Sequence, residues 1–564
     1  MPTPRQPRKA SPDPLINYAG RWIALLDGKV IGQGGTPDQA RLAAKFTRPK
    51  DTPQVVFVSL PNSIDLSPLI DKIASMLPPD REAYIVGGVV RDMLLGRQSH
   101  DLDLVMKGDV MEITRSLANR LGAAYFPMDP EHGVARLILR QQDGDKIVVD
   151  VATMRGPDLE TDLRSRDFTI NAMALEIHDP QAVLDPLGGA VDLQEKRLAP
   201  CLPSSFSDDP VRVLRGLRLA AAYGLKIPQE SRQKMRQAAP MLPMVSPERL
   251  RDELFRILDG PQPAAVLRGM EMLGALAYVL PELAHLKGVE QSPPHLDDVW
   301  NHTLSVLVRL ECILDLLGLK INEEKASSLH AGMVVMQLGR YRQQIAQHLA
   351  ERLNPERTLR ALLFLAALYH DAAKPETRSV ESSGRVRFFN HEEIGAKLAI
   401  NRGQALRLSN DEIERMAVIV ANHMRPMLLA LSEDQPTPRA IYRFFRVTDK
   451  AGLDVCLLSL ADTWATYGET LSQTIWNGHL DVVRALMGAW WERPEQHVSP
   501  PALLNGTEIM HHFHLVPGPL IGELLESIRE AQAIGLVSTK EDALGLIGKQ
   551  LAERKKPPDK LQYE

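Results

Sequence analysis

Two carboxylates, Asp101 and Asp103, begin the apolar run DLDLVM. Alternate residues of a β-strand share a face, and a carboxylate pair at this spacing can jointly hold divalent cations. A third carboxylate, Asp150, lies in KIVVDVAT, where alternation places it on the face opposite Val149 and Val151. The three aspartates predict a cation site built on strands.

A glycine pair precedes these aspartates. Gly87-Gly88 follows AYIV, a short apolar run that predicts a strand, and begins a helical segment that carries Arg91. Glycines at a helix start let backbone N–H groups approach phosphate oxygens, and an arginine adds a charge-assisted contact. Combined in one short strand, helix and strand, these residues predict a site that binds phosphate groups.

Histidines and further aspartates form a second set in the C-terminal half of the chain. They lie on or beside predicted helices: His302, His370, Asp371, His391, His423 and Asp462.

The elements that must position the first set are predicted between residues 63 and 200. Five strand-like segments, AYIVGG, HDLDLVM, AYFPMD, VARLILR and KIVVDVAT, have helical segments between them, which is typical of an α/β domain around one mixed sheet. Beyond about Pro203 the apolar spacing predicts successive amphipathic helices. The predicted fold class is therefore α+β, with an α/β head followed by mostly helical neck, body and tail.

A small ββαβ unit is expected before the head. RWIALLDGKVIGQG predicts two strands around Asp27-Gly28, TPDQARLAAKF a helix capped by Thr36, and QVVFVSL a third strand. We can assign this unit no function from its residues.

Composition bounds the class of protein. The 564 residues, 44% of them hydrophobic, allow about four domains with sizeable cores. The net charge of −5 means that any nucleic acid must be bound by local basic faces. Three cysteines outside any CxxC pair argue against a disulfide framework, and the sequence shows neither a signal peptide nor an apolar run of membrane-spanning length. We expect a cytoplasmic protein with no membrane partner.

Several motifs occur together in one order. The run 84–106 is followed by RSRDFTINAMAL at 164–175, DDPVRVLRGLRLAAAYGL at 208–225 and SPERLRDELFRIL at 246–258. Over about residues 63–260 the chain resembles the class II tRNA nucleotidyltransferases and related poly(A) polymerases.

The resemblance implies a mechanism. Asp101 and Asp103 would hold two Mg²⁺ ions that position a nucleoside triphosphate and activate the RNA 3′-hydroxyl for in-line attack on the α-phosphate, with Asp150 as a third catalytic carboxylate. The residues implied in triphosphate binding are Gly87, Gly88, Arg91 and Arg166.

The resemblance also implies how the base is read. Asp209 offers only acceptors and Arg212 only donors, a pair that can satisfy the amino-bearing edges of both C and A. Arg215 and Arg218 would support them, and the spacing of three residues from Asp209 onward predicts one stripe on a helix. Asp208 departs from the glutamate usual in the family, which affects only the helix cap.

The second set resembles the HD superfamily of metal-dependent phosphohydrolases, through the adjacent pair His370-Asp371. By this resemblance His302, His370, Asp371 and Asp462 would bind Mn, Fe, Co, Ni or Zn, and His391 and His423 would serve a second ion or a substrate phosphate. Whether that site hydrolyses phosphate esters or is a scaffold stays open.

A row of basic residues lies further along. Arg439, Arg443, Arg446 and Lys450 are spaced to share one helical face, which would either track a phosphate backbone or be a solvated helix edge.

The expected activity is addition or repair of the tRNA 3′ CCA end from CTP and ATP, with no DNA partner. Poly(A) addition, addition of CC or A alone, and an HD phosphohydrolase acting on RNA ends or cyclic phosphates stay as alternatives. The predicted domains are 1–62 (accessory), 63–200 (head), 201–268 (neck), 269–480 (body with HD domain) and 481–564 (tail).

Overall fold

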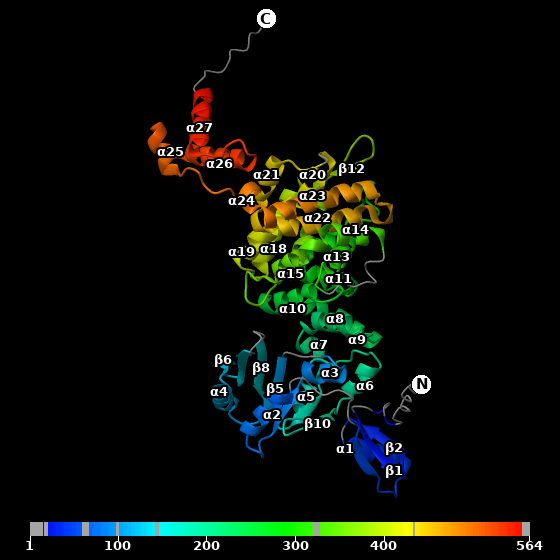
Figure 1. Cartoon of the computed structure of the whole chain (residues 1–564). Helices are drawn as coiled ribbons and strands as arrows, with labels where there is room; N and C mark the ends of the chain where they lie inside the picture. The colour runs from blue at the N-terminus through cyan, green and yellow to red at the C-terminus, as the bar shows by residue number, and fades with distance from the viewer. Residues whose placement is uncertain are drawn as a thin grey trace, which may run out of the picture. The chain divides into compact units, whose positions relative to one another are not determined.

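The structure, a computed structural model, describes residues 15, 18, 21–35, 37–58, 67–97, 101–140, 146–319, 328–432 and 435–554. They form two compact units that divide between Leu242 and Pro243, and each unit is treated by itself (Figure 1). The division into five domains stays a prediction.

A small sheet begins the first unit, as predicted. Strands β1 (Trp22–Leu26), β2 (Lys29–Gly34) and β3 (Gln54–Phe57) pair in the order β2-β1-β3, and helix α1 (Pro37–Thr47) packs on them. The β1–β2 turn uses Asp27 and Gly28, both at positive φ. Thr36, the expected helix cap, lies outside the described residues.

The head of the first unit is a seven-stranded mixed sheet in the order β10-β9-β4-β5-β8-β7-β6. Its only parallel pair among the described strands is β5 with β8, and alternation buries Leu102, Leu104, Val149 and Val151 on the core face. The five predicted strands are present, and the three-residue strand β9 and the six-residue strand β10 were not predicted. The strands are β4 (Ala83–Val86), β5 (Asp101–Met106), β6 (Ala124–Asp129), β7 (Val134–Arg140), β8 (Lys146–Thr153), β9 (Ala174–Glu176) and β10 (Asp179–Leu184).

Helices complete the first unit. α3 follows β4 directly, α4 packs on β7 and β8, and α5 follows β8 after a short connection. The helices are α2 (Ser67–Met76), α3 (Gly88–Leu94), α4 (Val110–Leu121), α5 (Leu159–Arg164), α6 (Gly189–Gln194), α7 (Ser205–Asp208), α8 (Arg212–Tyr223) and α9 (Gln229–Ala238).

The second unit is helical in its described residues apart from a hairpin of two three-residue strands, β11 (Arg378–Val380) and β12 (Val386–Phe388). Its centre is α16 (Leu359–Tyr369), which is apolar on all sides and buried except at Arg360. α16 packs against α10 (Pro247–Asp259), α13 (Val299–Leu316), α19 (Asn410–Asn422) and α22 (Gly452–Tyr467).

The second unit contains further helices before its tail (Figure 1). They are α11 (Pro263–Met272), α12 (Leu276–Val279), α14 (Leu329–Leu338), α15 (Arg342–Ala350), α17 (Lys374–Thr377), α18 (His391–Ala405), α20 (Arg425–Ser432), α21 (Pro438–Thr448), α23 (Gln473–Glu492) and α24 (Pro494–His497).

The tail has a core of its own. α25 (Gly506–Phe513), α26 (Pro519–Ala533) and α27 (Lys540–Arg554) bury a cluster that includes Ile509, Leu524 and Ile547. Together with the mixed-sheet head and the helical body, this confirms the predicted α+β class. Across the described residues, no helix combines the length and apolar character needed to cross a bilayer.

Candidate active sites

Three aspartates meet on one face of the head sheet. The parallel register of β5 and β8 places Asp103 beside Asp150, and Asp101 lies two residues earlier on the same face of β5. Burial raises the pKa of Asp103 to about 6, and the charge of Asp150 contributes to the rise. Crowded, partly buried carboxylates are costly as anions, and a divalent cation offsets that cost. The donor set therefore fits Mg²⁺.

Asp150 has a protein partner of its own. Arg136 on β7 donates from Nε to Oδ1 (2.7 Å) and from Nη2 to Oδ2 (2.9 Å) of Asp150. The structure thus brings Asp150 to the site together with a neutralising guanidinium, which sequence reasoning missed. Arg136 could have been identified only from the register of β7 on β8, in which it is the cross-strand neighbour of Asp150.

Gly87 lets the β4–α3 turn approach the carboxylates. Its φ is +81°, and a Cβ atom there would lie 2.7 Å from Oδ2 of Asp103. Only glycine fits this turn without displacing the carboxylate. Gly88 is the first residue of α3, so the N-terminal end of that helix lies next to Asp103, as expected for a phosphate-binding turn.

Arg91 lies buried behind this turn. Its guanidinium donates to both carboxylate oxygens of Asp92 (3.0 Å each), to Oδ1 of Asn171 (2.5 Å) and to the hydroxyl of Tyr223. These bonds tie α3 to α8 across the head. The triphosphate contact implied for Arg91 stays a prediction, and the contacts in the structure are those of a residue that positions the turn.

Arg166 stands beside the aspartates. A Cβ atom on Gly87 would lie 3.7 Å from its Nη1, and its charge partly counteracts the rise in the Asp103 pKa. The buried Asp162 accepts from its Nε (3.1 Å) and Nη2 (2.9 Å). Asp162 was missed by sequence reasoning, although its i, i+4 spacing to Arg166 was visible. The pair places a cation next to the expected triphosphate.

Arg212 is held by the backbone of the head. Its Nη2 donates to the carbonyl of Ser165 (3.1 Å), and its Nη1 donates to those of Arg166 (3.3 Å) and Ser205 (3.4 Å). Its Nε lies 3.8 Å from Oδ2 of Asp209, is buried, and has no hydrogen-bond acceptor among the described residues. The structure thus brings Asp209 and Arg212 together, and their role in reading a base stays a prediction.

The expected helical stripe is wrong at its first residue. Asp209 is extended at the end of α7, and α8 begins only at Arg212, because Pro210 has no N–H to continue a helix. Arg215, on the first turn of α8, donates to Oδ2 of Asp167 (3.2 Å), and Arg218 lies one turn further along. The hydroxyl of Ser204 donates to Asp208 (2.7 Å), so the residue that departs from the family pattern serves in the α7 turn.

The second set of predicted residues converges in the helical unit. Asp371 is central: its Oδ2 lies 3.2 Å from Nε2 of His370 and 3.6 Å from Nε2 of His302, and its Oδ1 lies 3.4 Å from Nε2 of His391. Nε2 of His302 also lies 3.0 Å from Oδ1 of Asp462. The ligand atoms form two triads that share Asp371, one with His302 and His370 and one with His391 and His423.

Three of these imidazoles are oriented in one way. His370, His391 and His423 each place Nδ1 2.7–2.9 Å from the carbonyl three residues earlier in the chain. A carbonyl only accepts, so in the neutral imidazole Nδ1 carries the proton and the Nε2 lone pair is left to bind a metal. Local backbone geometry therefore sets the tautomer that metal binding requires.

Electrostatics also favour a cation here. Nε2 of His370 is buried and has no hydrogen-bond partner of normal geometry among the described residues, although Oδ2 of Asp371 lies 3.2 Å away. Burial would raise the pKa of Asp371, but His370 and Lys374 outweigh it and hold the pKa well below its ordinary value. Imidazoles around an ionised, buried carboxylate fit a divalent transition metal.

Two neighbours of this cluster were missed. Lys374 Nζ lies 2.7 Å from Oδ2 of Asp371 and donates to Gln291 (2.6 Å). The ring of His295 packs edge-on against His302, with 5.0 Å between ring centroids, and burial lowers its pKa to about 4. The i, i+3 spacing of Asp371 and Lys374 could have predicted their ion pair from the sequence. The position of His295 beside His302 depends on the tertiary fold alone.

Comparisons with known families agree with this layout. Residues 83–199 match the poly A polymerase head domain, residues 224–287 match a probable RNA and SrmB-binding site of polymerase A, and residues 343–463 match the HD domain. His302 precedes the last match.

Curated relatives span most of the chain. A CC-adding tRNA nucleotidyltransferase of Thermus thermophilus is 33% identical, over 82% of this chain and 92% of its own length. An A-adding tRNA nucleotidyltransferase of Deinococcus radiodurans is 31% identical, over 84% and 96%. A multifunctional CCA protein of Pseudomonas paraeruginosa is 36% identical, over 43% and 64%.

Solved structures share the fold. The complex of a CCA-adding enzyme with CTP superposes with a TM-score of 0.54 at 21% identity, and it covers 87% of this chain and 95% of its own. The CC-adding and A-adding relatives align over more than nine-tenths of their own length, and the head, RNA-binding and HD segments occur in the order seen in the sequence motifs. The chain therefore belongs to the class II tRNA nucleotidyltransferase and poly(A) polymerase family, as a member with an HD domain.

Proposed function

We propose that this tRNA nucleotidyltransferase adds the two cytidines of the tRNA 3′ end. Complete CCA addition from CTP and ATP, the expectation from the sequence, is the second candidate. The observation that carries the choice is a continuous set of contacts that restrains Arg212 of the proposed base-reading pair.

The contacts run from the β8–α5 connection to Arg212. The backbone N–H of Arg155 donates to Oδ1 of Asp162 (3.0 Å), and Oδ2 of Asp162 accepts from Arg166. The carbonyls of Ser165 and Arg166 in turn accept from Arg212. The connection itself comprises only residues 154–158. A short segment bound at this point restrains the group that reads the base.

A base-reading pair whose donors and acceptors cannot move favours one nucleotide. Cytosine and adenine both place an amino donor beside a ring-nitrogen acceptor, but the purine sets these groups at a different position relative to the ribose. A site that accepts C twice and then A must therefore move its donors and acceptors. Relatives named CC-adding in Thermus thermophilus and Geobacter sulfurreducens support cytidine as the single base, whereas the A-adding relative supports adenosine.

The proposed roles follow from the geometry. Asp101 and Asp103 would hold the Mg²⁺ ions, which would neutralise charge on the triphosphate and favour deprotonation of the attacking hydroxyl. Gly87 and Gly88 present backbone N–H groups to phosphate oxygens, and Arg166 adds a cation. The remaining members of the nucleotide site are Asp209 and Arg212, which read the base, and Arg215, Arg218, Arg91 and Asp150, which position their neighbours.

A single-turnover extension assay tests the proposal. Three tRNAs, ending before the CCA, after C and after CC, are incubated with Mg²⁺ and with CTP, ATP or both. We expect addition of C to the first two and no addition of A to the third. Addition of C to the first two tRNAs and of A to the third would establish the CCA enzyme instead. Addition of A to the third tRNA without any addition of C would establish an A-adding enzyme, and A added to many RNAs without use of CTP would indicate a poly(A) polymerase.

We infer a second activity, phosphate-ester hydrolysis, at the HD cluster. The two ligand triads that share Asp371 support it, since a bound metal supplies an activated water and a Lewis acid for phosphate. The test uses 2′,3′-cyclic nucleotides and RNA ends with Mn²⁺, Ni²⁺, Co²⁺, Fe²⁺ or Zn²⁺. Hydrolysis that survives Asp101→Ala and disappears in His370→Ala is expected. No hydrolysis with any metal would make the cluster a scaffold.

A further inference from the structure

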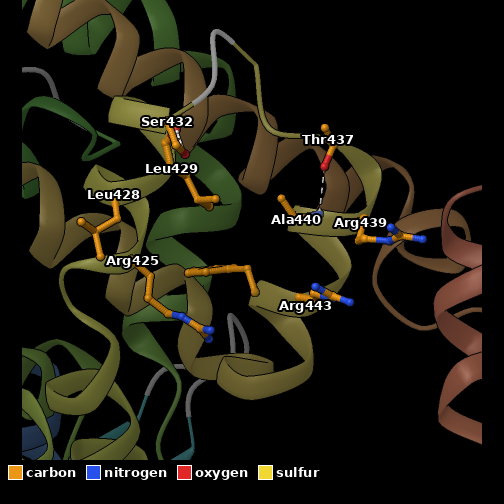
Figure 2. Close-up of a pocket in the computed structure, with 9 residues that line it drawn as sticks. Arg425, Leu428, Leu429, Ser432, Thr437, Arg439, Ala440 and Arg443 are labelled. Atoms are coloured by element: carbon orange, nitrogen blue, oxygen red, sulfur yellow. Dashed lines mark hydrogen bonds between the residues drawn. The ribbon is translucent and has the colours of Figure 1, made fainter. Parts of the chain in front are cut away.

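Helices α20 and α21 of the second unit line an open pocket of about 510 Å³ that has arginines along its rim (Figure 2). Its apolar side is formed by Leu428, Leu429 and Phe444. The arginines that line it are Arg425 of α20 and Arg439 and Arg443 of α21.

The arginines of α21 already bind carboxylates. Figure 2 shows Arg439 and Arg443 leaving α21 on the same side. Their Nε and Nη2 atoms lie 3.0 Å and 2.8 Å from the same oxygen of Glu530, and Nε of Arg446 lies 2.8 Å from Glu526. Both glutamates belong to α26 of the tail. Three members of the predicted basic row therefore share a face that pairs with the tail, whereas Lys450 lies in a 3-10 turn after the end of α21, so the prediction of one helical face is wrong for Lys450.

Positive charge is in excess on this face. A single carboxylate, Glu530, serves two guanidiniums, and Arg425 adds a third next to the pocket. The Tyr442 hydroxyl donates to Oε1 of Glu526 (2.8 Å). Arg446 and Arg529 both lie near enough to Tyr442 for their positive charges to lower its pKa, so two cations surround this one carboxylate. An arginine-rich surface with fewer carboxylates than guanidiniums attracts a polyanion.

The carboxylates are exchangeable partners. The side chains of Arg439, Arg443 and Arg446 are 53%, 63% and 58% exposed, so their ion pairs are surface pairs that salt screens. A phosphate offers a guanidinium the same fork of oxygens with more negative charge. The tail buries its own apolar cluster, so it can lose these pairs and remain folded.

We propose that the α20–α21 surface binds the sugar-phosphate backbone of tRNA, and that Glu526 and Glu530 occupy its arginines when RNA is absent. Because the glutamates compete with RNA for the same donors, their removal tightens binding. The inference rests on tRNA being the substrate.

Binding of a fluorescent tRNA that ends before the CCA tests the surface, with the full-length protein at several salt concentrations. Arg439→Ala/Arg443→Ala is expected to weaken binding about tenfold and to lower the slope of log Kd against log salt by about 1.4 to 1.8, the value for two phosphate contacts. Glu526→Gln/Glu530→Gln is expected to tighten binding about threefold. Arg484→Ala, which removes an exposed α23 arginine paired with Asp481, is the matched control.

The two glutamates separate the proposal from simple docking of the tail. If they only anchor α26, their substitution leaves tRNA affinity unchanged or lowers it, and the proposal is overturned. Equal salt slopes for the double-arginine variant and the wild type would overturn it as well. Arg439→Lys/Arg443→Lys keeps the charge, and an intermediate affinity shows that a folding defect does not cause the loss. A wild-type chain that adds no nucleotide refutes the proposed function, whereas one that adds nucleotides with unaffected variants refutes only this surface.

Discussion

Replacing Asp103 by asparagine is expected to stabilise the metal-free first unit while it abolishes nucleotide addition. Asp103 lies partly buried beside Asp150, and its pKa is about 6 against an ordinary value of 3.8. Asparagine has nearly the shape of the protonated acid and cannot become an anion. The substitution therefore removes the cost of ionising this side chain in the folded state.

The size of the stabilisation by Asp103→Asn and its pH dependence follow from the pKa values of Asp103 in the folded and unfolded states. Below pH 3.8 the carboxyl is protonated in both states, and between 3.8 and about 6 the folded state holds the extra proton, so stability falls as the pH rises. Above pH 6 the full cost of about 3 kcal/mol is present. The gain from Asp103→Asn is then about 3 kcal/mol at pH 8 and about 1 kcal/mol at pH 4.5.

Scanning calorimetry of the full-length protein in EDTA measures the effect. For a unit of this size the gain corresponds to roughly 6–12 °C in Tm at pH 8 and roughly 2–4 °C at pH 4.5. Mg²⁺ at pH 8 should raise the Tm of the wild type and leave that of the variant unchanged, because the ligand charge is gone. Asp80→Asn, at an exposed turn before β4, is the matched control.

Two results would refute this reasoning. A lower Tm for Asp103→Asn at pH 8 would show that the carboxylate makes stabilising contacts rather than waiting for a cation. An equal gain at pH 4.5 and pH 8 would show that the stabilisation is unrelated to ionisation.

Three more predictions concern other parts of the chain. Asp162→Asn removes the carboxylate that holds Arg166, so kcat/KM for CTP should fall about tenfold and the preference for CTP over ATP should narrow, as measured by single-turnover extension of both nucleotides. His370→Ala should release the HD metal, seen by elemental analysis, while CTP addition stays within about twofold, because the head has its own metal site. Asp454→Asn should cost about 3–5 kcal/mol in denaturant unfolding of the second unit, because it leaves the buried Arg415 without its counter-charge.

The sequence predicted the parts of the fold that depend on neighbours along the chain. Apolar alternation located β5 and β8, and with them the face that carries Asp101, Asp103 and Asp150. The stripe predicted from Asp209 failed because a spacing of three does not reveal where a helix begins, and Pro210 delays the start of α8. Strands as short as β9 had too few residues for alternation to be detected.

The sequence by itself determined which residue types bear the chemistry and in what order they occur, because carboxylates, glycine turns and histidines act through their local character. Only the tertiary structure decided which of them meet. The parallel register sets Asp103 beside Asp150, and helix packing brings His302 and Asp462 to one cluster across 160 positions. The pairing of α21 with α26 likewise depends on the surfaces that two distant helices present. Such contacts arise from register and packing between distant segments, which no local pattern encodes.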